Sequence, residues 1–250
     1  MEFSPCLDML FRELPFRDRM QRISRLGFRW FEFWSWWDKD LEAIIAAMHE
    51  LDLRLAAFCT RFISLADAAR RQEYLEALRH AIGVAERTDC GVIITQVGAQ
   101  LESPSRDEQK LSIIEGLADS ARLLDGTKIS LVIEPLNTIY DHPGYFLTRS
   151  GEALEILREV GSPNIGMLFD VYHQQASEGN LIGNLRRCGD SVRHIHVADC
   201  PGRHELGTGE INYANIFDEL RLMDFRGRVG IELLPSTGDD AKALSNPLFR

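Results

Sequence analysis

Short apolar runs rich in leucine and β-branched residues alternate along the chain with longer amphipathic segments, a pattern that predicts strands separated by helices. The apolar runs place eight strands at residues 3–6, 28–33, 53–58, 91–96, 131–134, 166–170, 194–197 and 229–232. The segments between them predict helices at 16–26, 40–51, 65–87, 106–124, 151–160, 181–188 and 213–223, with Asp38 and Ser105 as N-caps of the second and fourth. Because no linker divides this alternation, we expect an α/β fold with one domain over residues 1–250, a (β/α)8 TIM barrel.

Four of the predicted strands, all in the C-terminal half, end at a side chain that can bind a metal ion or move a proton. These side chains are Glu134, Asp170, His196 and Glu232, at successive intervals of 36, 26 and 36 residues. Each interval has room for a strand and a crossover helix, so the four strand ends should meet at the catalytic rim of the barrel. Burying each group alone would be costly, which favours a shared divalent cation. Three carboxylates and one imidazole suit Mn²⁺ or Mg²⁺, and Co²⁺ is also compatible.

Composition and charge limit the partners of the chain. A chain of 250 residues with 45% apolar residues can bury the core of one barrel, and its formal net charge of −10 argues against nucleic acid, which binds basic surfaces. The N-terminal sequence has no signal-peptide pattern and no stretch approaches the roughly 18 apolar residues of a membrane span, so we expect a soluble cytoplasmic protein. The five cysteines contain no CxxC pair and predict neither a disulfide framework nor a zinc site.

Four segments carry a resemblance to a known family. They are IEPLN at 133–137, FDVYHQQ at 169–175, HIHVADCPGRHELGTGEINY at 194–213 and GIELLP at 230–235. Together they resemble the xylose-isomerase-like TIM-barrel superfamily of sugar isomerases and epimerases, over essentially the whole chain. Within it, PGRHELGTGEINY at 201–213 and the segment from EPLNT to PGYFL at 134–147 are most similar to hydroxypyruvate isomerases.

The resemblance implies roles for the four strand-end residues. Glu134, Asp170, His196 and Glu232 match the family's metal ligands, and Glu134 and Glu232 also match its two acid/base carboxylates. Two carboxylates can move a proton between adjacent carbons of an α-hydroxy carbonyl compound, while a chelated cation acidifies that proton and stabilises the enediolate. The implied activity is the interconversion of hydroxypyruvate and tartronate semialdehyde, in glyoxylate and carbohydrate metabolism.

The resemblance also implies substrate contacts. His173, three residues after Asp170, matches a substrate-contacting histidine, and Arg203 matches an arginine that approaches the substrate's oxygens. Arg203 and His204 form a cationic pair on the loop after the seventh strand, where the planar arginine fork suits a substrate carboxylate. A solvated loop triplet of Arg203, His204 and Glu205 is the other interpretation of this segment.

A ketose 3-epimerase is the alternative activity on the same barrel and metal site. Many hydroxypyruvate isomerases carry glutamine where this chain has His196, whereas ketose 3-epimerases carry histidine there. Returning the proton to the neighbouring carbon gives isomerisation, and returning it to the opposite face of the same carbon gives epimerisation. The residues alone do not separate these two outcomes.

Two other classes of protein share this barrel. An apurinic-site endonuclease needs further histidines on early strands and an Asp-x-His pair after the seventh, but here the early rim reads CTRF at 59–62 and TQVG at 95–98, and the late loop reads RHE at 203–205. A non-catalytic sugar- or acid-binding barrel should lose one of the two glutamates, and both Glu134 and Glu232 are present. Both features favour the metal-dependent isomerase or epimerase over these two classes.

Three further features lie near the predicted site in the sequence. We expect His194 to point to the opposite side of its strand from His196 and to pack there. Glu32 is a candidate carboxylate behind the site, although the face on which it lies is not set by the sequence. The aromatic run between Trp30 and Trp37 fits core packing, a lid or pocket wall, or a contact in a homo-oligomer.

Overall fold

Eight parallel strands form a closed barrel in the computed structural model, which describes residues 1–249. Neighbouring strands in the sequence are neighbours in the sheet, and the last strand pairs with the first. The barrel closes between the first two strands through a parallel bridge from Cys6 to Glu32 and a 2.8 Å hydrogen bond from Leu7 N to Glu32 O. The predicted (β/α)8 barrel is therefore confirmed. The strands are β1 (Glu2–Pro5), β2 (Trp30–Glu32), β3 (Arg54–Cys59), β4 (Val92–Thr95), β5 (Ser130–Ile133), β6 (Ile165–Asp170), β7 (Val192–Val197) and β8 (Arg228–Ile231).

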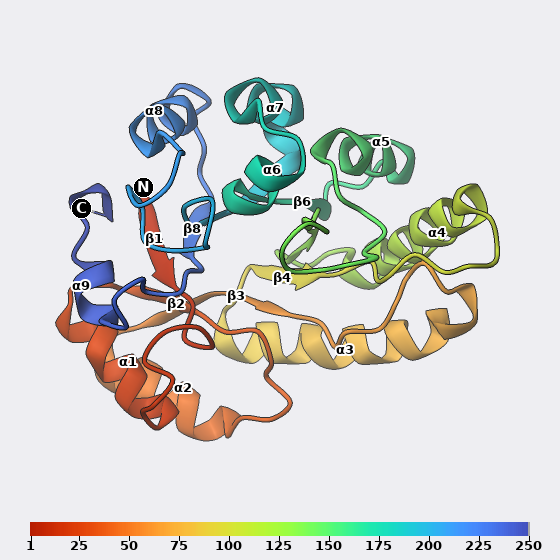
Figure 1. Ribbon diagram of the computed structural model, residues 1–250. Coiled ribbons are helices and arrows are strands. Elements are labelled where there is room, and N and C mark those ends of the chain that lie inside the picture. Colours follow the sequence, from red (N-terminus) through yellow and green to blue (C-terminus); the bar gives the residue numbers. More distant parts are fainter. Residues whose placement is uncertain (250) are drawn as a thin grey trace.

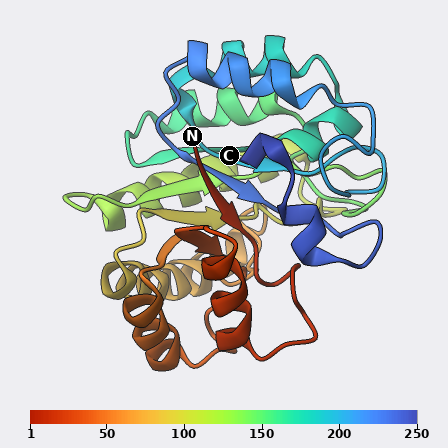
Figure 2. The same cartoon turned by 90° about the vertical axis from the view of Figure 1, so that its left-hand side faces the viewer.

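The helices lie around the outside of the strands (Figure 1). They are α1 (Phe16–Arg25), α2 (Leu41–Leu51), α3 (Arg71–Thr88), α4 (Arg106–Leu124), α5 (Ser150–Val160), α6 (Val171–Ser177), α7 (Leu181–Cys188), α8 (Tyr213–Leu222) and α9 (Asp240–Leu244). The sequence pattern missed the two short helices α6 and α9. The two ends of the chain lie side by side in both views (Figures 1 and 2), where the rings of Phe3 and Phe249 are 5.2 Å apart.

The helix caps follow local chemistry, with one correction to the prediction. Ser105 caps α4 as expected, in a capping box with Glu108. The cap of α2 is Asp40, whose side chain accepts a 3.0 Å hydrogen bond from Ala43 N, so the prediction of Asp38 was wrong. Asp38 lies two residues before this cap and accepts instead from the Ser35 hydroxyl at 2.6 Å.

The strand alternation divides the apolar residues into two groups. On β6, Phe169 belongs to the large core that fills the space between the barrel and its helices, whereas Leu168 belongs to a small cluster inside the barrel. The inner cluster contains Ala57, Cys59, Ile94, Val132 and Leu168. Because residues two apart on a strand share a face, Val132 and Leu168 predict an inward direction for Glu134 and Asp170.

Two expectations about the chain as a whole can be compared with the structure. All five cysteines are buried and none forms a disulfide, as predicted. None of the helices within residues 1–249 combines the length and the apolar character needed to cross a membrane.

Candidate active site and metal centre

The carboxyl ends of β5 to β8 bring four buried side chains together. Glu134 directly follows β5, Asp170 ends β6, His196 lies near the end of β7 and Glu232 directly follows β8. One potential ligand atom from each lies within 4.8 Å of those of the other three. The Nδ1 atom of His196 is 3.0 Å from Glu232 Oε2, 3.8 Å from Glu134 Oε1 and 4.0 Å from Asp170 Oδ2. The four residues meet because parallel strands deliver their carboxyl ends to one rim of the barrel.

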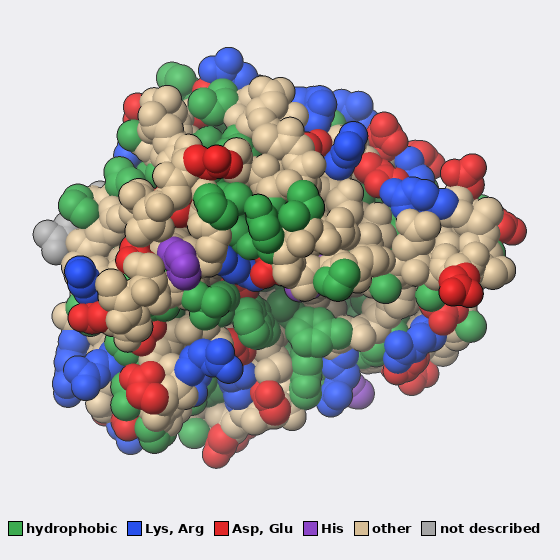
Figure 3. Space-filling view, in the orientation of Figure 1, with side chains coloured by type: hydrophobic (Ala, Val, Ile, Leu, Met, Phe, Trp, Pro, Cys, Tyr) green, Lys and Arg blue, Asp and Glu red, His purple; other side chains and the backbone are tan. Residues whose placement is uncertain are grey.

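A pocket of about 410 Å³ opens above this cluster at the same end of the barrel. In the space-filling view it is a hollow with hydrophobic side chains around it (Figure 3). Large exposed apolar residues on the loops that carry pocket residues include Phe62, Ile139, Tyr140 and Leu234. The residues that line the pocket are Trp34, Cys59, Phe62, Gln96, Glu134, Leu136, His142, Tyr145, His173, Arg203 and Glu232.

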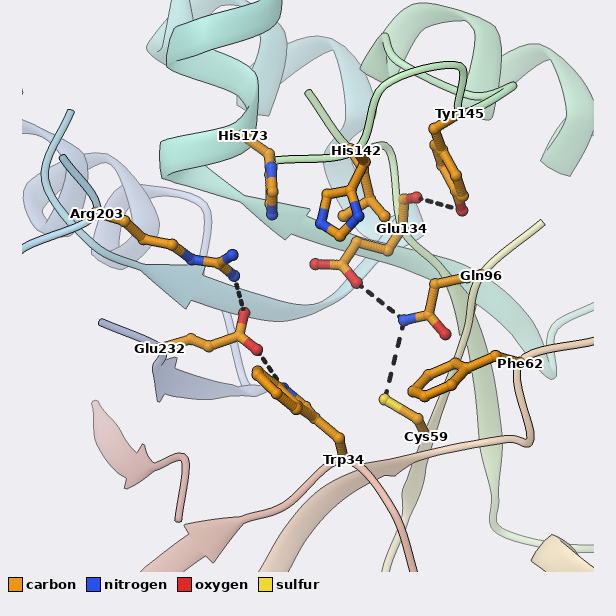
Figure 4. Close-up of a pocket in the computed structure, with 11 residues that line it drawn as sticks. Trp34, Cys59, Phe62, Gln96, Glu134, His142, Tyr145, His173, Arg203 and Glu232 are labelled. Carbon is orange, nitrogen blue, oxygen red and sulfur yellow. Dashed lines mark hydrogen bonds and ion pairs between the residues drawn. The ribbon is translucent and has the colours of Figure 1, made fainter. Parts of the chain in front are cut away.

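Glu134 and Glu232 reach this pocket with different hydrogen-bond partners (Figure 4). Gln96 Nε2 donates to Glu134 Oε2 at 3.3 Å, so that carboxylate has a neutral amide beside it. Glu232 accepts a 2.8 Å charge-assisted bond from Arg203 Nη2 through Oε2 and a bond from the Trp34 indole through Oε1. The two carboxylates therefore have unequal surroundings at one cavity.

The electrostatics of the two glutamates follow from these partners. Burial raises the pKa of Glu134 to about 8, with His196 opposing the change and Glu232 and Asp170 reinforcing it. Burial acts on Glu232 in the same direction, but the positive charges of Arg203 and His196 outweigh it and hold the pKa of Glu232 far below its usual value.

The donor set fits a divalent cation. Three carboxylates and an imidazole are buried within reach of one another, and burial raises the pKa of Glu134 and of Asp170, so their ionised forms need a compensating positive charge. Carboxylate and imidazole donors are ligands that hard and borderline divalent ions prefer, and a bound ion would supply the missing positive charge. The cluster is consistent with a divalent metal site.

The fold and the site agree with a comparison against known families. A family model described as a xylose isomerase-like TIM barrel matches residues 20–246, almost the whole chain. The chain belongs to this family. The resemblance seen in the sequence is thereby confirmed.

Named relatives of this xylose isomerase-like protein cover nearly its full length. It is 33% identical over 250 residues to a hydroxypyruvate isomerase from Escherichia coli, covering 96% of both chains. It is 31% identical over 251 residues to a 2-oxo-tetronate isomerase from Cupriavidus necator, covering 96% of this chain and 95% of the relative. A crystal structure of a protein named AP endonuclease, family 2, from Brucella melitensis matches with a TM-score of 0.93 and 28% identity, covering 98% of this chain and 96% of the other.

His173 and Arg203, both predicted to contact substrate, line the pocket of this family member. His173 lies in the first turn of α6 rather than on a loop, because the Asp170 side chain caps that helix by accepting from His173 N at 3.1 Å. Its Nδ1 is 3.2 Å from Asn137 N, which donates to it, and its buried Nε2 has no hydrogen-bond partner among residues 1–249. This nitrogen lies 3.7 Å from Asp170 Oδ2, beyond hydrogen-bond distance, so its hydrogen-bonding capacity is left open.

His204 is not brought into the pocket. Its Nδ1 is 2.7 Å from the carbonyl oxygen of Leu234, and the residue does not line the cavity. Neighbouring residues on this tight loop point in different directions, since Arg203 has a positive φ of 57° that turns the chain between them. The expected pairing of Arg203 with His204 at the substrate is therefore not seen.

Several lining residues were not predicted from the sequence. Cys59 ends β3 and Gln96 follows β4, so the rule that identified the later strands could have indicated them. His142 and Tyr145 lie on the loop after β5, where no periodic pattern exists. Of the interpretations open for the aromatic run, Trp34 forms part of the pocket wall.

The expectation for His194 was wrong. Residues two apart on a strand share a face, so His194 and His196 both point into the barrel, with their rings 5.2 Å apart. Both rings contact Glu32, which is 2% exposed: the distances are 3.0 Å from His194 Nε2 to Oε1 and 2.9 Å from His196 Nε2 to Oε2. Glu32 therefore lies directly behind the cluster of Glu134, Asp170, His196 and Glu232.

Proposed function

We propose that this chain is a metal-dependent isomerase that interconverts hydroxypyruvate and tartronate semialdehyde (2-hydroxy-3-oxopropanoate). The observation that carries the proposal is that Glu134 and Glu232 both line one cavity and both belong to the buried cluster with Asp170 and His196, while each glutamate keeps its own set of partners. The relatives named hydroxypyruvate isomerase and 2-oxo-tetronate isomerase support a small 2-oxo acid as the substrate, because each name contains that of such an acid.

The two glutamates carry the proton transfer in this proposal. One removes a proton from the hydroxymethyl carbon of hydroxypyruvate, and the other returns a proton to the neighbouring carbon that was the carbonyl, while the hydroxyl proton passes between the two oxygens. The roles of Glu134 and Glu232 exchange when the reaction runs in the other direction. When bound by Glu134, Asp170, His196 and Glu232, Mn²⁺ or Mg²⁺ supplies Lewis-acid polarisation of the substrate's carbonyl and hydroxyl oxygens.

Arg203 and two histidines form the end of the pocket that would receive the substrate carboxylate. Arg203, His142 and His173 all line the cavity, and the rings of His142 and His173 are 5.3 Å apart. The Arg203 guanidinium already binds Glu232 through Nη2, and its Nε is buried without a hydrogen-bond partner within residues 1–249. The wall around Trp34, Phe62 and Leu136 offers the substrate apolar surface instead. An acidic substrate would therefore orient its carboxylate toward Arg203.

A ketose 3-epimerase is the second candidate, and His196 is the observation that favours it. His196 lies in the cluster, and its Nδ1 faces the carboxylates. Ketose 3-epimerases, which the chain resembles at this position, carry histidine there. The same pair of glutamates would serve both reactions, since only the carbon that receives the proton differs.

A paired turnover assay tests the proposal. Chelator-treated protein is reloaded with Mn²⁺ and given hydroxypyruvate in one sample and fructose or tagatose in another, with unloaded protein as the control. We expect Mn²⁺-dependent turnover of hydroxypyruvate, and its loss in Glu134→Gln and Glu232→Gln while circular dichroism stays unchanged. Glu219→Gln is the matched control, because Glu219 pairs with Arg186 outside the pocket. Turnover of the ketose alone would replace the isomerase with the epimerase, and near-normal turnover in either pocket variant would refute the two-glutamate scheme.

A further inference from the structure

A buried polar group lies behind His196, on the side away from the pocket. Glu32 ends β2, and its two oxygens contact three side chains from two other strands. Ser4, on β1, donates its hydroxyl to Oε1, which also contacts His194 Nε2 at 3.0 Å, while Oε2 contacts His196 Nε2 at 2.9 Å. Both oxygens of the carboxylate thus have partners inside the barrel, and Glu32 does not line the cavity.

We propose that Glu32 is a positioning residue that fixes the ring of His196 so that Nδ1 faces Glu134, Asp170 and Glu232. This inference rests on the metal site of the proposed function. To bind a cation the imidazole must be neutral, with one N–H and one lone pair, and a carboxylate that accepts from Nε2 places the proton there. With an ion bound, the lone pair would lie on Nδ1, the atom that is 3.0 Å from Glu232 Oε2. Carboxylates that hold a histidine in this way tune metal affinity from behind the ligand.

The neighbouring strand leaves space for this contact. Gly230 on β8 faces the same point, and a Cβ atom there would lie 2.4 Å from His196 Cδ2 and 2.6 Å from Glu32 Oε1. Any side chain at this position would push the imidazole and the carboxylate apart. The absence of a side chain at Gly230 is thus a second feature that the pairing of Glu32 with His196 requires.

Glu32, His194 and His196 form a second group that could bind a cation, since their potential ligand atoms lie within 4.8 Å of one another. The contacts favour the positioning role. Oε1 of Glu32 already has two donors, and a cation on His196 Nε2 would compete with the bond to Oε2. We therefore expect one ion per chain.

Metal titration of the purified, chelator-treated protein tests the inference with readouts other than turnover. Mn²⁺ is titrated calorimetrically, and Co²⁺ binding is followed by its visible absorption. For Glu32→Gln we expect Mn²⁺ affinity to fall by about 10- to 100-fold and the Co²⁺ spectrum to change. Gly230→Ala should act in the same direction from a different strand. Tyr74→Phe is the control: it removes a buried hydroxyl bonded to Thr95 at 3.0 Å and should leave both readouts unchanged.

The outcomes distinguish this inference from the proposed function. If the wild-type protein binds one ion and Glu32→Gln binds it with the same affinity and spectrum, the positioning role is overturned while the metal site stands. If the wild-type protein binds two ions and Glu32→Gln binds one, Glu32 is a ligand of a second cation and the inference is wrong. If the wild-type protein binds no ion, the metal site and the inference fall together. A purely structural role would lower the melting temperature of the metal-free variant without changing the Co²⁺ spectrum.

Discussion

Asp199 organises the loop that carries Arg203, and replacing it should destabilise that loop measurably. The side chain is fully buried just after β7 and accepts three backbone hydrogen bonds. Oδ1 accepts from Cys200 N at 2.9 Å and from Ile211 N at 3.1 Å, and Oδ2 accepts from Gly207 N at 2.7 Å. A single carboxylate therefore closes the segment from 199 to 211 around the residue that binds Glu232.

The magnitude follows from the number of donors that lose their acceptor. Asp199→Ala leaves three N–H groups without a partner, and at about 1 to 1.5 kcal/mol for each we expect the free energy of unfolding to fall by about 3 to 5 kcal/mol. Asp199→Asn can keep its carbonyl oxygen at the Oδ1 position and retain two of the bonds, so its loss should be about 1 to 2 kcal/mol. The order of the two variants is part of the prediction.

Urea unfolding of the two variants and of the wild-type protein measures these differences. Asp218→Ala serves as the control, because Asp218 forms an exposed pair with Arg221 on α8 and its loss should leave the unfolding midpoint unchanged. Turnover should also fall in Asp199→Ala, since Arg203 is held by this loop. An Asp199→Ala protein whose free energy of unfolding lies within about 1 kcal/mol of wild type would contradict this prediction, and so would an Asp199→Asn variant as unstable as Asp199→Ala.

Two further predictions concern the pocket and a helix end. Arg203→Ala should reduce kcat/KM for hydroxypyruvate more than for a neutral ketose, because only the acid presents a carboxylate to the guanidinium; equal losses in parallel steady-state assays would remove the carboxylate-recognition argument. Ser105→Ala should lower the free energy of unfolding by about 1 kcal/mol, because the capping box with Glu108 is lost; thermal unfolding measures this, and an unchanged Tm would contradict it.

The strand-end residues were predictable because their position depends only on where each apolar run stops. Glu134, Asp170, His196 and Glu232 need no knowledge of register, since every parallel strand of a closed barrel brings its carboxyl end to the same rim. The helices that lie between long apolar runs were predictable for the same reason. Short elements such as α6 were not, since seven residues give too few turns for a helical period to stand out.

The position of Glu32 could not be read from the sequence. The pairing of β2 with β3 shifts register between Phe31 and Glu32, and such an irregularity changes where a side chain points without leaving a signal in the apolar pattern. His142 and Tyr145 belong to the loop after β5, whose path is set by tertiary contacts such as the 2.8 Å bond from Val97 N to the Tyr145 hydroxyl. The loop residues of the site therefore required the structure.

In three of the four clustered residues, one side-chain atom contacts a neighbour outside the cluster while the other atom faces the cluster. Asp170 uses Oδ1 to cap α6 and turns Oδ2 toward His196, and Glu134 has Gln96 on Oε2 and His196 nearest to Oε1. His196 follows the same rule, with Glu32 behind it on Nε2.

Glu232 departs from this rule, because Oε2 contacts both Arg203, at 2.8 Å, and His196, at 3.0 Å. A cation at the cluster would compete with Arg203 for that oxygen. When a cation binds, the contact between Arg203 and Glu232 Oε2 must therefore change. A guanidinium released from Glu232 is also the group best placed to receive a substrate carboxylate.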